Sequence, residues 1–199
     1  MEVTGKYSEL TRGQTEAIVN KLGGMEGVKR FLAGELDVVV KAAIAFIFTL
    51  WRMLTVGVYQ SVTDIRSALA TAGMRLGDWA ADILGKVTLP VTAETVEFGR
   101  TTVRELGFTK ATKLRDILAA IKARGHKLCL ATDGVAIRIG YPDQPNGECV
   151  WLAMEPVAGS GGLSRILRVG RDGGGLWLGA YCYGLDGVWN PGSEFFFRK

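Results

Sequence analysis

Apolar positions in the first part of the chain repeat at spacings of three and four residues, the pattern of amphipathic helices. A first helix is expected to begin after Thr11, because Thr11 and Gln14 fit a capping box, and to end at Gly23. A second short helix follows and is expected to end at Gly34. Two helices of this length are marginally stable in water, so we expect the hairpin to dock on another surface.

The most apolar stretch, residues 42–51, is uncharged and lies between Lys41 and Arg52. As a helix it would span about 15 Å, half of the roughly 30 Å of bilayer hydrocarbon. Extension to residue 59 adds enough length but places Arg52 within the apolar span, which is unfavourable in a bilayer. The pattern therefore favours a buried central helix. Membrane association of residues 42–59, with Lys41 and Arg52 reaching the interface, is the alternative.

Two more helices are predicted over 63–72 and 75–84, each ending at a glycine. The next residues break the helical pattern with Pro90 and several β-branched side chains. We interpret this break as a domain boundary. The predicted division is a helical domain over 1–86, a linker over 87–95 and a second domain over 96–199.

The second half begins with a predicted strand near 96–103 and a helix over 112–124. The period of the apolar positions then changes from 3.6 to 2, which is typical of strands, and the connections are short and rich in turn-forming residues. Strands are expected at 127–131, 135–141, 149–157, 164–171, 176–183 and 194–198. The predicted fold class is α+β: a helical N-terminal half followed by a helix and a mainly antiparallel sheet.

The alternation of side chains gives this sheet two different faces. One face is aliphatic and is expected to carry Val135, Ile137, Ile139, Val150, Leu152, Met154, Leu176 and Leu178. The opposite face is aromatic and basic and is expected to carry Arg138, Trp151, Trp177, Tyr181 and Tyr183. These five side chains form the candidate binding surface, because rings and basic groups can stack bases or sugar rings and attract a phosphate backbone. The alternative is that the 112–124 helix covers the rings and makes them core.

Composition and charge add further limits. The 199 residues are 48% apolar and 22% charged, which excludes a disordered or collagen-like chain. The whole net charge of +4 falls in the second half, and basic residues concentrate between Lys110 and Lys127. Such a stripe can attract phosphates or acidic partners, or it can be the polar face of a surface helix. Three cysteines make no disulfide scaffold, and the first residues resemble no secretory signal, so we expect a cytoplasmic protein.

Several local motifs occur in a familiar order along most of the chain. They are LTRGQTEAIVNKLGGMEGVKRFLAGEL at 10–36, DWAADILGK at 78–86, VRELGF at 103–108, DQPNGE at 143–148, AMEP at 153–156, GGLWL at 174–178 and VWNPGSEFFFRK at 188–199. In these motifs the chain resembles a family of uncharacterised proteins common in metagenome-derived bacterial genomes. The resemblance implies no activity, ligand or catalytic residue.

Two constellations could support an enzyme. His126 is the only histidine, and a cysteine needs such a base to act as a nucleophile, but the odd separation of Cys129 from His126 sends the two side chains to opposite faces of a strand. Cys149 or Cys182 could approach His126 through the fold. Asp143 and Glu155 are candidate acid and base residues around a hairpin.

Neither the histidine and cysteines nor the glycine-rich turns have the spacing of a zinc site or a phosphate-binding loop, so we expect no metal and no cofactor. The sequence therefore favours a non-catalytic interaction module that binds a protein partner or, more specifically, single-stranded nucleic acid. The alternative is a small hydrolase that uses Asp143 and Glu155, or His126 with a cysteine.

Overall fold

The computed structural model describes residues 11–36 and 50–199 and divides the chain into two units, Met1–Ala45 and Phe46–Lys199. The predicted linker at 87–95 lies inside the second unit, so the predicted boundary differs from the division in the structure. The predicted helical domain fails as a unit because residues 50–56 and the helices that follow pack with the C-terminal sheet.

In the first unit the two predicted helices are confirmed as α1 (Arg12–Lys21) and α2 (Gly24–Leu32). The capping box at Thr11 is present, and Gly23 and Gly34 follow the helices with positive φ angles of 90° and 75°. Of the described residues of this hairpin, Gly27 alone is buried. The apolar side chains of Met25 and Leu32 are exposed, as expected of two helices too short to form a core.

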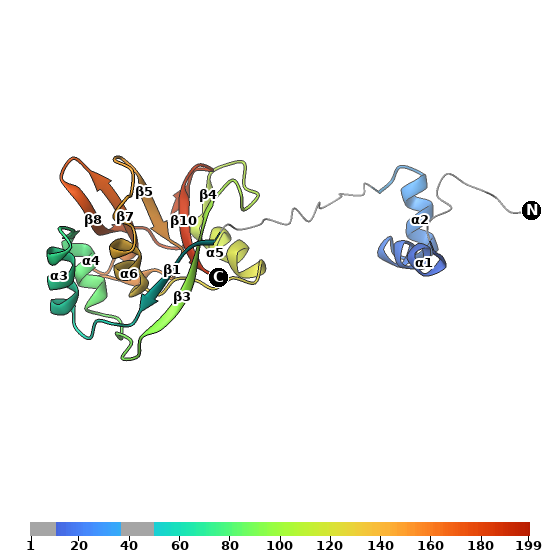
Figure 1. Ribbon diagram of the computed structural model, residues 1–199. Coiled ribbons are helices and arrows are strands. Elements are labelled where there is room, and N and C mark those ends of the chain that lie inside the picture. The colour runs from blue at the N-terminus through green and yellow to red at the C-terminus, as the bar shows by residue number, and fades with distance from the viewer. Residues whose placement is uncertain (1–10, 37–49) are drawn as a thin grey trace, which may run out of the picture. The chain divides into compact units, whose positions relative to one another are not determined.

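The second unit is built on an eight-stranded mixed sheet, mostly antiparallel, which confirms the α+β class (Figure 1). Its strands are β1 (Leu50–Val56), β2 (Arg75–Leu76), β3 (Glu94–Thr102), β5 (Cys149–Leu152), β6 (Val157–Ala158), β7 (Ser164–Asp172), β8 (Gly175–Cys182) and β10 (Glu194–Arg198). Their order is β1-β3-β10-β5-β7-β8-β2, with β6 beside β7. Two short strands, β4 (Thr112–Lys113) and β9 (Val188–Trp189), pair separately.

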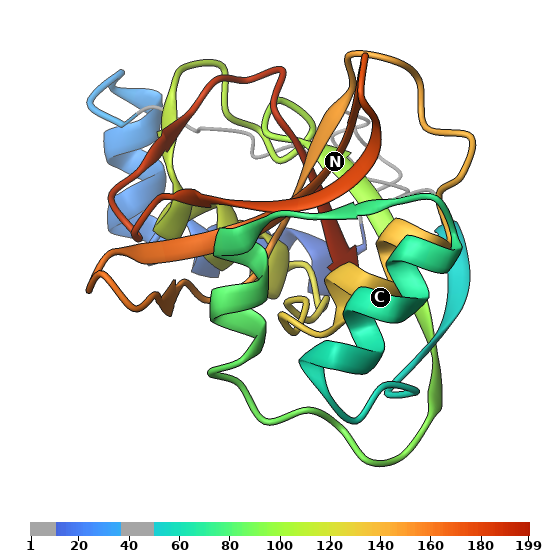
Figure 2. The same cartoon turned by 90° about the vertical axis from the view of Figure 1, so that its left-hand side faces the viewer.

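Four helices accompany this sheet: α3 (Val62–Thr71), α4 (Asp78–Leu84), α5 (Leu114–Ala123) and α6 (Asp133–Ile139). The first three confirm the helices predicted over 63–72, 75–84 and 112–124. α3 and α4 lie near β8, whereas α5 lies near β4 and β10 (Figures 1 and 2). α6 packs directly on the sheet, because a Cβ atom on Gly134 would lie 3.0 to 3.3 Å from the side chains of Leu167, Leu178 and Leu152.

The predicted central helix is wrong where the structure describes it. Residues 50–56 form strand β1, which pairs with β3, and Trp51 packs on Phe196 with ring centroids 4.4 Å apart; residues 42–49 lie outside the described residues. A short apolar run has no period that separates a strand from a buried helix, so only the pairing with β3 decided it. Arg52 donates hydrogen bonds to the carbonyl oxygen of Gly140 and to Asp143. No helix in the described segments is long and apolar enough to cross a membrane.

The predicted strand at 135–141 is also wrong, because Asp133–Ile139 is helix α6. Val135, Ile137 and Arg138 are all buried, so helical periodicity disappears from a short segment that is enclosed on several sides. The neighbouring prediction at 127–131 reduces to one bridge between Lys127 and Arg198, and 149–157 divides into β5 and β6. The predicted strands near 96–103 and over 164–171, 176–183 and 194–198 are confirmed as β3, β7, β8 and β10.

A buried ion pair joins α6 to the last strand. Asp133 is fully buried, and both of its carboxylate oxygens accept hydrogen bonds from Arg198, at 2.7 and 2.6 Å. The backbone N–H of Leu130 donates a third hydrogen bond to the same carboxylate, at 2.7 Å. A buried carboxylate with three donors is satisfied, and it becomes costly when the arginine is removed.

We predict that Arg198→Met lowers the free energy of unfolding by about 3 kcal/mol, because Asp133 then remains buried without a countercharge. Chemical denaturation measured by far-UV circular dichroism checks this value. Arg115→Met is the matched control, since Arg115 forms an exposed ion pair with Asp186, and it should cost less than about 1 kcal/mol. Equal losses in the two variants would contradict the role of the buried pair.

Candidate functional site: an aromatic sheet face around Arg168

Four of the five predicted binding residues lie together on one side of the sheet. Strand pairing places Trp151 opposite Arg168, Gly170 opposite Trp177, and Ile166 opposite Tyr181. Directly paired residues project from the same side of a sheet, as do residues two positions apart on one strand. We therefore define the aromatic face as Trp151, Arg168, Trp177, Tyr181 and Tyr183.

Three rings of this face, those of Trp151, Tyr181 and Tyr183, contact one another. The ring centroids of Trp151 and Tyr183 are 5.5 Å apart in an edge-to-face arrangement, and those of Tyr181 and Tyr183 are 5.2 Å apart. Trp151 and Tyr181 are 6.4 Å apart, also edge to face. The cluster continues inward to the buried Trp189, whose centroid lies 4.3 Å from that of Tyr183. One side of the cluster is thus anchored in the core, which restricts ring motion.

Arg168, which is not among the five predicted binding residues, lies between these rings. Its guanidinium carbon is 5.2 Å from the ring centroid of Trp151 and 5.1 Å from those of Trp177 and Tyr181. Such distances are within the range of cation–π attraction. Within the described ranges Arg168 has no carboxylate partner: its only hydrogen bond is a long one of 3.8 Å to Cys149 Sγ, and its Nε is buried without an acceptor. The positive charge is therefore held by rings.

Arg138, the fifth predicted residue, is not on this face. It lies on α6, fully buried, and donates hydrogen bonds to Gln144 Oε1, to the carbonyl oxygen of Tyr141 and to that of Gly170, the last at 3.2 Å. Burial lowers the pKa of Arg138 to about 10. The prediction failed because the segment is helical, so alternation could not place its side chains. Arg138 donates to the backbone of β7 and is enclosed away from solvent.

Trp177 lies flat against the sheet because two glycines make room for it. A Cβ atom on Gly170 would lie 2.2 Å from the indole ring, and one on Gly179 would lie 3.2 Å from it. Gly170 is the direct pairing partner of Trp177. These two positions therefore determine the orientation of the ring, and a larger residue at Gly170 would displace it.

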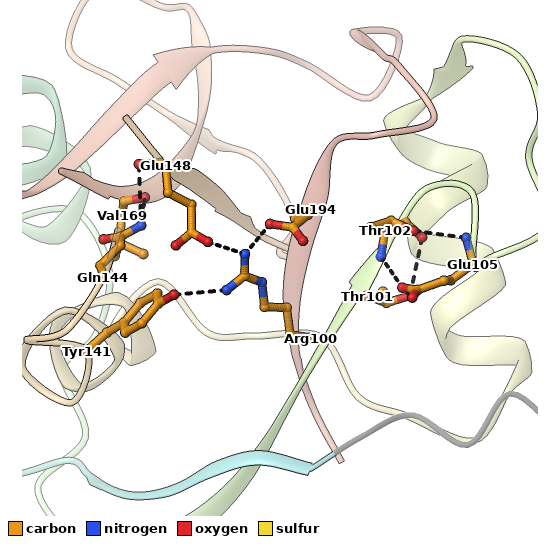
Figure 3. Close-up of polar contacts among 9 residues, drawn as sticks. All are labelled: Arg100, Thr101, Thr102, Glu105, Tyr141, Gln144, Glu148, Val169 and Glu194. Atoms are coloured by element: carbon orange, nitrogen blue, oxygen red, sulfur yellow. Dashed lines mark hydrogen bonds and ion pairs between the residues drawn. The ribbon is translucent and has the colours of Figure 1, made fainter. Parts of the chain in front are cut away.

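A polar network, drawn in Figure 3, holds the loop that precedes β5. Arg100 donates hydrogen bonds to Tyr141 Oη at 3.0 Å, to Glu148 at 2.5 Å and to Glu194. In the same loop Gln144 Nε2 donates to the carbonyl oxygen of Val169 on β7, at 3.3 Å. The network therefore connects β3, β10 and the loop to the strand that carries Arg168.

The two glutamates of this network could suggest acid–base chemistry. Burial opposes ionisation of Glu148, but its hydrogen bond from Arg100 prevails and lowers the pKa of the carboxyl group. A general acid needs the opposite shift, toward a carboxyl group that keeps its proton near neutral pH. The arrangement is that of an ion-pair network that fixes a loop.

The aromatic face borders a pocket of about 390 Å³. Its lining residues are Arg75, Leu76, Gly77, Asp78, Arg168, Asp172, Trp177, Leu178 and Gly179. Arg75 is the pairing partner of Trp177 and forms an ion pair of 2.5 Å with Asp172. Arginine, aspartate and indole groups thus meet in one open, largely polar depression at the β2 and β8 edge.

The rings are part of the surface. α5 buries its apolar stripe of Leu114, Ile117, Leu118 and Ile121, and its N-terminal backbone bonds to the loop after β8. Nevertheless Tyr181 remains 49% exposed, and Trp151, Trp177 and Tyr183 are half-buried. The helix therefore leaves this part of the sheet open, in contrast to the alternative in which it covers the rings.

The structure does not bring the predicted acidic pair together. Asp143 forms an ion pair with Arg52 at 2.7 Å, and Glu155 forms one with Lys122 at 2.9 Å. Both carboxylates are more than half exposed, and neither lines the pocket beside the aromatic face. Ion pairs on separate partners explain the two side chains without a shared substrate.

The hydrogen bonds that the cysteines of the described segments form are with groups other than an imidazole. The ring of His126 lies 4.7 Å from that of Phe197, and burial lowers the pKa of this histidine. Cys129 Sγ donates a hydrogen bond to the carbonyl oxygen of Phe196, at 3.3 Å, and Cys149 Sγ accepts one from Arg168. Among the residues that the structure describes, no group of three or more His, Cys, Asp or Glu side chains could hold a metal ion.

Comparison with protein-family models, with curated proteins and with solved structures finds no match for this chain. The resemblance to a bacterial family and the binding role of the aromatic face therefore stay predictions.

The three thiols are expected to differ in reactivity. Cys182 is exposed, whereas burial raises the pKa of the Cys129 thiol well above its usual range and also raises that of Cys149. Because the thiolate is the reactive form, iodoacetamide at about pH 8 should modify Cys182 first and leave Cys129 unmodified. Peptide mass spectrometry measures the sites, and the denatured protein, in which all three should react, is the control. Equal rates at Cys129 and Cys182 would contradict the structure.

Proposed function

We propose that this chain is a non-catalytic binding module and that its aromatic face binds single-stranded nucleic acid. The observation that carries the proposal is the position of Arg168: a guanidinium without a carboxylate partner among residues 11–36 and 50–199, surrounded by three rings on an open part of the sheet. Single strands are bound by such combinations, because bases stack on rings while cationic groups attract the phosphates.

Charge favours a polyanion over a neutral ligand. The net charge of +4 comes from the half of the chain that forms most of the sheet. Asp172 is already paired with Arg75, so its repulsion of an anion is reduced. The attraction of a phosphate backbone would add to the stacking on Tyr181.

A protein partner is the second candidate. Tyrosine, tryptophan and arginine are the residues that most often carry the binding energy of protein interfaces, and the aromatic face consists of these three types. Such an interface would depend weakly on salt, whereas strand binding should weaken steeply as salt rises. A hydrolase ranks below both, since Asp143 and Glu155 lie in separate ion pairs. The free cysteines suit a reducing compartment, and we propose the cytoplasm.

Fluorescence anisotropy with a labelled oligothymidylate at low salt tests the proposal. The wild-type protein should bind, and Tyr181→Ala should weaken binding about tenfold, because the loss of one stacked base costs on the order of 1–3 kcal/mol. Tyr181 is the suitable residue because it is the most exposed ring of the aromatic face, so its removal disturbs the core least.

Trp79→Ala is the matched control. Trp79 is 53% exposed, and its ring centroid lies 3.8 Å from the guanidinium carbon of Arg165. Trp79 lies on α4 and is not part of the aromatic face. It should leave the affinity unchanged. Absence of wild-type binding at low salt would refute the nucleic-acid function, and equal losses in the two variants would show that the aromatic face is not the site.

A further inference from the structure

The pocket beside Trp177 has features that the stacking rings alone do not explain. Two arginines, Arg75 and Arg168, line it from different strands, and it is large enough for a group of nucleotide size. Arg168 brings a charge without a carboxylate partner in the described part of the chain. Arg75 brings a charge that is exposed to solvent and has Asp172 and the carbonyl oxygen of Gly175 as its hydrogen-bond partners.

The acidic partner of Arg75 is Asp172. The two side chains form an ion pair of 2.5 Å, and about half of each side chain is exposed to water. Asp172 is oriented independently of Arg75, because it also accepts a hydrogen bond of 2.8 Å from the backbone N–H of Gly174 in its own turn. That N–H and Arg75 together lower the pKa of Asp172, so the carboxylate is charged at neutral pH. An ion pair this exposed contributes little net free energy and exchanges readily for another anion.

We propose that this pocket is the phosphate subsite of the aromatic face, where one phosphodiester of a bound single strand takes the place of Asp172 as the partner of Arg75 and is also bound by Arg168. This inference rests on the proposed function. The neighbouring base then stacks on the aromatic face, which begins at the pocket wall with Trp177.

The acidic residues of the pocket select the kind of phosphate. Asp78 and Asp172 line the pocket together with the two arginines. A phosphodiester carries one negative charge, whereas a terminal phosphate carries close to two near neutral pH and meets stronger repulsion from the carboxylates. The subsite therefore accepts an internal phosphate, and a 5′-phosphorylated oligothymidylate should bind no more tightly than its 5′-hydroxyl form.

The test measures the affinity for oligothymidylate over a series of salt concentrations. Arg75→Gln should weaken binding and reduce the slope of log K against log salt by about 0.7, the change expected when one phosphate contact of a single strand is lost. Asp172→Asn should tighten binding, because the competing charge disappears while the amide oxygen still accepts from Gly174. Opposite effects from the two members of one ion pair are the signature of competition.

Lys122→Gln and Glu155→Gln are the matched controls. This ion pair has side-chain exposures of 54% and 60%, close to the 53% and 54% of Arg75 and Asp172, but it lies away from the pocket. Neither control should change the affinity or the slope. Thermal unfolding of all four variants should be close to that of the wild type, since both pairs are exposed.

The possible results distinguish a failure of the phosphate subsite from a failure of nucleic-acid binding as a whole. Binding that is lost with Tyr181→Ala but unchanged by Arg75→Gln and Asp172→Asn overturns the subsite alone. Weaker binding by Asp172→Asn, or an equal loss with Lys122→Gln and Arg75→Gln, also overturns it, because the effect is then structural or a general response to charge. Absence of wild-type binding overturns both the proposed function and the subsite.

Discussion

Hydrogen bonds from the buried side chains of Arg138 and Gln144 to the backbone of β7 support the strand that carries Arg168. Cys149 and Val150 of β5 pair with Gly170 and Val169 of β7, and the carbonyl oxygens of these two β7 residues also accept hydrogen bonds from Arg138 and Gln144. Buried carbonyl groups need partners, and side chains supply them here. Because Gly170 lies beneath the Trp177 ring, the same bonds that satisfy β7 also support the aromatic face. Substitution of Arg138 would therefore affect the site although Arg138 does not belong to it.

The arginines of this unit have two different roles. The burial of each side chain and the groups that it contacts indicate which role it has. Arg198 and Arg100 are paired with carboxylates and join strands to a helix or a loop, while Arg138 is enclosed and bonded to backbone and amide oxygens. Arg168 has rings as its neighbours and no carboxylate within the described chain. A charge that the fold leaves uncompensated at an open surface is available to a ligand, whereas a compensated one stabilises the fold. This difference, more than the basic composition, supports the proposed function.

The helices and several strands were predictable because each of them carries a complete local signal. The stripe of α5 shows full helical periodicity, the capping box of α1 is a local motif, and β7, β8 and β10 are strand-length runs that follow glycine-rich or proline-containing turns. β1 and α6 were assigned to the wrong class. β1 is a short apolar run, and α6 is enclosed on several sides. Neither segment therefore shows the alternation of solvent-exposed and buried positions that distinguishes a helix from a strand. Pairing with β3 and packing beneath the sheet decided these elements.

In the candidate site, too, local sequence patterns predicted some features and tertiary contacts decided the others. Alternation alone placed Trp177, Tyr181 and Tyr183 on one side of the predicted strand 176–183, because residues two apart on a strand share a face whatever its partners are. The cation among them depended on register: Arg168 joins the rings only because β7 pairs with β5 at Trp151 and with β8 at Gly179. Register follows from contacts between residues distant in the chain, which a single sequence does not reveal. The sequence by itself thus determined that Trp177, Tyr181 and Tyr183 share a face, and the tertiary structure decided that Trp151 and Arg168 join them and which pocket they border.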